Sequence, residues 1–143
     1  MIIDNKLIDE LLAAAASSPR MRMNRDLRNS PSDHSQRMLN ALHPGTRVAI
    51  HRHCDSSETV IVLRGKIKEI MYNDKGERVG EYLLEPSSSL VGMDIPKGQW
   101  HTVEVLNPSV IIEMKDGEYK PLTDEDILSI SNSREGNTNS CLL

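Results

Sequence analysis

The sequence has no phenylalanine, one tryptophan and three tyrosines, so aromatic side chains make up only 3% of its 143 residues. A hydrophobic core must therefore be built from Val, Ile, Leu and Met. The two cysteines are too few for a disulfide framework, which favours reduced thiols and a cytoplasmic location. No apolar run reaches the roughly 18 residues that a membrane-spanning helix needs. The first residues carry acids where a signal peptide needs positive charge.

Positively charged residues are fewer than negatively charged ones. Lys and Arg number 17 against 21 Asp and Glu, which gives a net charge of −4 with neutral histidines. Proteins that bind nucleic acid usually show a basic excess, so we expect no nucleic-acid partner and no membrane partner. The hydrophobic fraction of 38% and the charged fraction of 27% are typical of a globular protein. The length fits one domain.

The N-terminal third of the chain predicts a helix followed by irregular structure. Residues 4–16 place apolar side chains on one helical stripe, and Asp4 can cap this helix. Residues 20–35 are polar and read as an irregular segment that is rich in arginine. Residues 36–42 mix apolar and polar side chains and suit either a strand or a helical turn.

From residue 46 onward, short runs rich in Val and Ile alternate with turn signals. The expected strands are 47–52, 58–64, 66–72, 79–84, 90–95, 102–106 and 109–115. Strands at such regular spacing predict an antiparallel sandwich or barrel. Thr123 can cap a last helical turn that runs to Ile130.

The predicted fold class is mainly β, a small antiparallel barrel or jelly roll with an N-terminal helix and a short C-terminal helical turn. We expect residues 1–35 to form the helix and a basic arm. Residues 36–122 would form the barrel domain. Residues 123–143 would form the helical turn and a small, polar, mobile tail.

One constellation of side chains predicts a metal site. His51 and His53 stand two apart in a strand-like run, so both face the same side. The turn-like residues between His53 and Glu58 reset the alternation, which lets Glu58 face the same way. His101 follows a tight turn at residues 96–98. Three imidazoles and one carboxylate suit one divalent transition metal ion, such as Zn, Fe, Mn, Ni or Co.

The spacing of these residues resembles the two cupin motifs. Residues 45–65 follow the pattern G-x5-HxH-x4-E-x6-G of the first motif, from Gly45 to Gly65. Residues 96–101 resemble the second motif, P-x-G-x2-H. The resemblance implies a small β-barrel that holds a metal through His51, His53, Glu58 and His101.

A closer resemblance is to the WbuC-type cupin fold metalloproteins. It covers roughly residues 20–125 and rests on segments 20–24, 36–42, 95–103 and 113–119. Genes of that family are associated with O-antigen polysaccharide clusters, and its reaction is not established. The resemblance therefore implies a metal-binding cupin in surface-polysaccharide metabolism.

Several further side chains are candidates for a ligand pocket. Arg20, Arg22 and Arg28 lie on the predicted arm, which could fold over the barrel mouth and bind a phosphate or carboxylate; the alternative is a solvated basic loop. Glu113 interrupts an apolar run and lies either on the solvent face or in the cavity, where burial would raise its pKa and suit it to acid–base work. Tyr119 could supply a polar contact.

Two neighbours of the motif histidines are expected to stay outside the site. Trp100 should point to the opposite face of its strand from His101 and pack in the outer layer. Cys54 does not occupy a motif position, and we expect it to be a buried free thiol.

The favoured hypothesis is a metal-dependent enzyme that acts on a small anionic ligand, a carbohydrate or sugar nucleotide. The metal would act as a Lewis acid in isomerase, epimerase or lyase chemistry, although an Fe-dependent dioxygenase needs the same ligands. The alternative from another class is a non-catalytic, regulatory cupin that binds metal and ligand. A metal-independent epimerase would not call for three histidines and Glu58. We also expect a homodimer.

Overall fold

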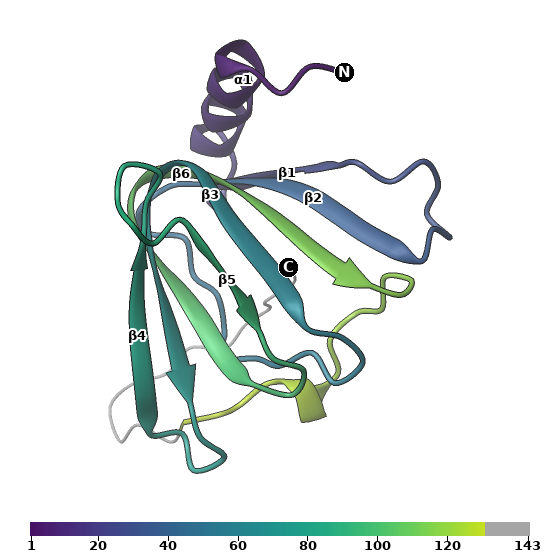
Figure 1. Cartoon of the computed structure of the whole chain (residues 1–143), viewed down its shortest axis with the longest axis vertical. Helices are drawn as coiled ribbons and strands as arrows, with labels where there is room; N and C mark the ends of the chain where they lie inside the picture. Colours follow the sequence, from purple (N-terminus) through teal and green to yellow (C-terminus); the bar gives the residue numbers. More distant parts are fainter. Residues whose placement is uncertain (131–143) are drawn as a thin grey trace.

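Two long antiparallel strands, β3 and β6, organise the structure, which is a computed structural model that describes residues 1–130 (Figure 1). The elements in chain order are α1 Asn5–Ala16, β1 Arg22–Asp26, β2 Ser35–Leu42, β3 Glu58–Tyr72, β4 Arg78–Leu84, β5 Gly92–Ile95, β6 Trp100–Asp116 and the 3-10 turn η1 Asp124–Asp126. The tail predicted to be mobile, residues 131–143, lies outside the described residues.

The strands form one antiparallel sheet with the order β1-β2-β6-β3-β4, and β5 also pairs with β3. The ladder between β3 and β6 changes register between Val62 and Ile67. Bulges of this kind bend strands, and Figure 1 shows the sheet folded over on itself with β1 and β4 at its two edges. The predicted mainly β fold is therefore confirmed, in the form of a folded sheet that is not closed into a barrel.

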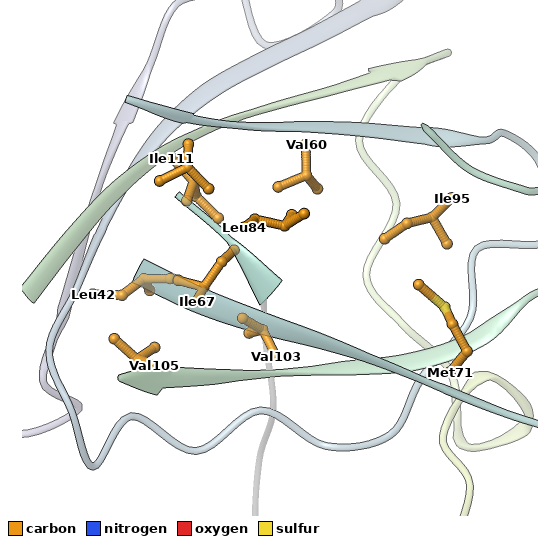
Figure 2. Packing of buried hydrophobic residues seen from close by; sticks show 10 residues of the cluster. Leu42, Val60, Ile67, Met71, Leu84, Ile95, Val103, Val105 and Ile111 are labelled. Atoms are coloured by element: carbon orange, nitrogen blue, oxygen red, sulfur yellow. The ribbon is translucent and has the colours of Figure 1, made fainter. Parts of the chain in front are cut away.

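The space inside the folded sheet is filled by aliphatic side chains, as the lack of phenylalanine predicts (Figure 2). The buried members of this cluster are Leu42, Val60, Val62, Ile67, Met71, Leu84, Ile95, Val103, Val105 and Ile111. They come from five strands, so the core connects both halves of the folded sheet.

The helix α1 covers the outer face of β2 and β6. Its buried residues Ile8, Leu11 and Ala15 pack against β2 and β6 residues that point away from the interior. Asp4 caps the helix by accepting a hydrogen bond from the backbone N–H of Leu7 at 3.0 Å, which confirms the predicted start. Within residues 1–130, no helix is long and apolar enough to cross a bilayer.

Several local expectations differ from the structure. The expected strands 58–64 and 66–72 form the single strand β3, and the expected strands 102–106 and 109–115 form the single strand β6. Residues 22–26 form the edge strand β1 rather than irregular chain, because an edge strand needs only backbone pairing to β2 and tolerates exposed polar side chains. Residues 47–52 are not a regular strand, since only His51 makes β-bridges. The last helical turn ends at Asp126, because the backbone of residues 127–128 pairs with the segment before His53 instead.

Substitution of Gly65, the last position of the first motif, tests whether the bend in β3 requires a residue without a side chain. Its φ is +90°, and a Cβ there would collide with the Pro108 carbonyl oxygen and the Ser109 hydroxyl. We expect Gly65→Ala to lower the free energy of unfolding by at least about 2 kcal/mol, measured by urea denaturation. Gly98→Ala is the matched control, because its φ is +79° but a Cβ would meet nothing within 4 Å. The control should cost about 1 kcal/mol, and equal costs would contradict the close-approach argument.

Candidate metal centre

The three motif histidines meet at one end of the folded sheet. The backbones of His51 and His101 pair directly, with N–H to carbonyl distances of 3.0 and 2.9 Å. One nitrogen from each of the rings of His51, His53 and His101 lies within 4.8 Å of the others. The structure thus brings together residues that are 50 positions apart in the sequence.

Backbone carbonyls set the orientation of two of these rings. Nδ1 of His51 lies 2.9 Å from the carbonyl oxygen of Ala49, and Nδ1 of His101 lies 2.9 Å from that of Gln99. A carbonyl oxygen only accepts, so Nδ1 carries a proton, and in the neutral form of each ring Nε2 keeps the lone pair. The same arrangement orients the histidine ligands of metal sites.

The Nε2 atoms of His51, His53 and His101 are buried and have no hydrogen-bond partner. A buried polar atom without a partner is costly, and a divalent ion bound by three imidazole nitrogens would satisfy all three atoms at once. The residues therefore fit a metal ion of the kind that the spacing predicts. His34 is exposed, and the Nε2 of His43 lies 2.8 Å from the Leu12 carbonyl oxygen, outside this group.

Glu58 lies beside the histidines and is paired with a lysine. Its Oε2 lies 2.9 Å from Nζ of Lys115, which donates a hydrogen bond. The same Oε2 lies 2.9 Å from Nε2 of His53, although the alignment is not that of a hydrogen bond, and Oε1 lies 3.7 Å from Nε2 of His101. Glu58 is thus within reach of two histidines while it forms a buried ion pair.

Burial and charge set the protonation of the site. Burial lowers the pKa of His51 to about 3, with a further contribution from His101, so its imidazole is neutral near pH 7. Burial works to raise the pKa of Glu58, but the Lys115 ammonium and the nearby rings of His101 and His53 outweigh it and hold that pKa well below its usual value. A neutral imidazole and an ionised carboxylate are the forms that bind metals.

Glu113 faces the interior, one of the two alternatives that the sequence left open. It is 6% exposed, and its Oε2 accepts a hydrogen bond of 2.8 Å from Nδ2 of Asn40. Burial, with the charge of Glu58, raises the pKa of Glu113 to about 7. A carboxyl group with such a pKa can both give and take a proton near neutral pH.

A second buried acid, Glu69 on β3, was not among the site residues predicted from the sequence. It is 3% exposed, and its Oε2 has no hydrogen-bond partner. Burial raises its pKa to about 8. The signal was present in the sequence, because Glu69 alternates with Ile67 and Met71, two apolar residues that fill the interior.

A cleft of about 610 Å³ opens beside the histidines. His53 and Lys115 belong to its lining, and residues 116–123 form much of its wall. Tyr119, a predicted pocket residue, lies in this wall. The opening joins solvent to one of the candidate metal ligands, so a small molecule could reach the centre from this side.

The three candidate arginines do not line this cleft, which has Arg52 in its lining instead. Arg28 is held by Asp26, with a closest N–O distance of 2.7 Å. Arg20 and Arg22 do not project together as an extended arm would require, because Met21 between them has a φ of +57°. As a result, Arg20 is exposed and Arg22 is buried in β1.

The predictions for the two neighbours of the motif histidines, Trp100 and Cys54, have different outcomes. Trp100 packs in an outer cluster with Ile70 and Tyr72, on the opposite side of β6 from His101, as predicted. The expectation of a buried thiol at Cys54 is wrong, because Cys54 is exposed. Its Sγ lies 3.4 Å from Asp126 Oδ1, since the turn after His53 carries it to the surface.

Comparison with solved structures defines the fold family. The chain is similar to KdgF from Halomonas sp. (16% identity, TM-score 0.55, 72% of this chain and 85% of that chain). It is also similar to the capsular polysaccharide assembling protein CapF from Staphylococcus aureus (24%, 0.58, 71% and 29%) and to oxalate decarboxylase OxdC from Bacillus subtilis (17%, 0.53, 68% and 25%). The chain thus spans less than a third of CapF and of OxdC. These neighbours are cupins, and the likeness establishes a cupin fold.

The family follows from the sequence model that matches residues 3–84, which is described as a domain of unknown function, DUF6016. This match covers more than half of the 143 residues, and the chain belongs to that family. No curated protein matches the sequence.

Glu69 gives a pH-dependent prediction for the metal-free protein. Its pKa is raised from 4.5 to about 8, so the parent should lose stability as the pH rises through this range, because only the unfolded chain ionises freely. Glu69→Gln removes this loss. We expect the variant to match the parent near pH 4.5 and to exceed it by roughly 2–4 kcal/mol at pH 8.5, measured by urea denaturation. The exposed Glu104→Gln is the control, and a parallel pH dependence of parent and Glu69→Gln would contradict the prediction.

Proposed function

We propose that this protein is a metal-dependent cupin enzyme of the WbuC type that acts on an anionic carbohydrate or sugar nucleotide in surface-polysaccharide (O-antigen) biosynthesis. The observation that carries the proposal is the set of three buried Nε2 atoms without partners, next to a cleft that admits a small molecule. The name of CapF, a capsular polysaccharide assembling protein, supports the carbohydrate class.

His51, His53 and His101 would hold one divalent transition metal ion, and Glu58 is the fourth candidate that the motif supplies. The metal, when bound, supplies Lewis acidity that polarises a carbonyl or hydroxyl oxygen of the ligand. The carbonyls of Ala49 and Gln99 hold a proton on Nδ1 of His51 and His101, so that Nε2 of each ring faces the site.

Glu113 is the proposed acid–base residue. Asn40 donates to Oε2 of Glu113, which holds the carboxyl group in one orientation and leaves Oε1 to exchange a proton. Its pKa of about 7 means that both protonation states are populated near neutral pH. A residue that takes a proton from one carbon and returns it to another atom serves isomerase, epimerase or lyase chemistry.

Ligand recognition is proposed for the wall of the cleft. Tyr119 offers a hydroxyl, and Lys120 offers a cation that now pairs with Asp55 at 3.1 Å on the surface. The arginines Arg20, Arg22 and Arg28 remain a prediction for anion binding that the cleft geometry does not support.

The raised pKa values of two interior acids favour an enzyme over a regulatory cupin, which would bind a ligand in the cleft but would need no acid–base group. An Fe-dependent dioxygenase would use the same histidines. The metal retained by protein purified without a chelating column, followed by a thermal-shift screen against sugar nucleotides, separates these functions. Retained iron with oxygen uptake would favour the dioxygenase.

The metal site itself is tested by His51→Ala. We expect this variant to lose stoichiometric metal and the rise in melting temperature on metal addition, because a metal that binds only the folded state stabilises it by mass action. Metal content by mass spectrometry and thermal unfolding are the measurements. His34→Ala, at an exposed histidine, should behave as the parent. Full metal content in His51→Ala would contradict the proposed site.

The proposal includes a cytoplasmic homodimer. Exposed apolar side chains gather on the edge strand β4 and the turn that follows it, at Val79, Tyr82, Leu83, Leu90 and Val91, and such a surface is suited to a second subunit. Light scattering at micromolar concentration should give twice the mass of 16.0 kDa. A monomeric mass would contradict the dimer and leave the metal site unaffected.

A further inference from the structure

The cross-strand neighbour of Glu58 distinguishes this site from a simple four-ligand centre. In the ladder between β3 and β6, Glu58 stands directly opposite Lys115. Side chains in such pairs lie close together on the same face of the sheet. The contact between Oε2 and Nζ at 2.9 Å is therefore imposed by the backbone register rather than by one flexible side chain.

Both partners of this ion pair are removed from water. The side chain of Glu58 is 3% exposed and that of Lys115 is 14% exposed. Separating a buried ion pair is strongly destabilising, because each charge loses its partner without regaining water. A metal ion that took Oε2 of Glu58 as a ligand would compete with the Lys115 ammonium for that oxygen and would lie close to this second cation.

The histidines are in the opposite situation. Their three Nε2 atoms are buried without a hydrogen-bond partner, and two of the rings are already oriented by backbone carbonyls. Binding a metal through these atoms breaks no hydrogen bond, although Nε2 of His53 lies 2.9 Å from Oε2 of Glu58. The two kinds of donor in the motif are thus not equally available.

We propose that Lys115 holds Glu58 out of the ligand set, so that three histidines bind the metal and Lys115 sets the affinity of the site. This inference rests on the proposed metal site and deepens it. Lys115 acts as a positioning residue, because its ammonium group engages the carboxylate and does not touch the metal. Since Lys115 also belongs to the lining of the cleft, an anionic ligand that entered there would compete with Glu58 for the same ammonium group.

The test is a comparison of Co²⁺ affinities by competition with a chelator, with the visible absorption of bound Co²⁺ as a report of its ligands. Lys115→Met releases Glu58 and removes a positive charge near the metal. We expect this variant to bind Co²⁺ at least about tenfold more tightly than the parent and to show an altered spectrum.

A double variant separates coordination from charge. Glu58→Gln with Lys115→Met removes both charges of the pair, so the net charge of the site is unchanged. We expect its Co²⁺ affinity to stay within about threefold of the parent, with the spectrum of the parent. If Glu58 is a ligand in the parent, the double variant will instead lose tenfold or more, and the inference is overturned.

Lys68→Met is the matched control, because Lys68 stands opposite the exposed Glu104 in the same ladder of β3 and β6 and pairs with it at 3.6 Å. It should leave Co²⁺ affinity unchanged. Lys115→Gln serves as a second release variant should the methionine variant not fold, which circular dichroism reports. If a folded release variant has an unchanged Co²⁺ affinity, the role of Lys115 is overturned and the proposed metal site is not. If the parent protein binds no Co²⁺, the proposed function and this inference are both overturned.

Discussion

The antiparallel pairing of β3 with β6 is the constraint on which the rest of the structure depends. Its register places Glu58 opposite Lys115 at one end and Met71 opposite His101 at the other. The register shifts near Gly65 bend the ladder, where the close approach of Ser109 leaves no room for a side chain. Because the sheet folds at this bend, residues at the two ends of the same pair of strands face one interior.

That interior combines an aliphatic core with acids that are costly to bury. The apolar cluster excludes water, which raises the pKa values of Glu69 and Glu113. Glu58, Glu69 and Glu113 all lie within the described residues. Among these three acids, only Glu58 has a cation, Lys115, at hydrogen-bond distance. One interior thus holds an ionised carboxylate, Glu58, next to two acids whose pKa values are raised to about 7 and about 8, and this separation of pKa values is what acid–base chemistry requires. The stability lost by burying these groups is consistent with a functional role.

Local sequence patterns predicted much of the fold because they depend on neighbours in the chain. The stripe of α1, the cap at Asp4 and the Val- and Ile-rich strands all follow from short-range spacing. The errors came where partners distant in the chain decide the outcome. Residues 22–26 became a strand because β2 offers an edge to pair with. Residues 47–52 form no regular strand, because their β pairing is limited to two isolated bridges at His51, to His101 and to Ile127.

The sequence by itself determined which chemical groups this protein could bring to a site: three imidazoles and a carboxylate at cupin spacing, with Glu113 in an apolar run. Alternation along a strand even placed Glu69 on the inner face. Only the tertiary structure decided which of these groups are already engaged. The ion pair between Glu58 and Lys115 and the contact of Arg28 with Asp26 depend on packing and register. The same holds for the orientation of the His101 ring. The spacing of residues in a chain specifies the face on which a side chain lies, whereas hydrogen bonds and burial, which set its charge and its freedom to bind, come from partners that the fold brings together from remote positions.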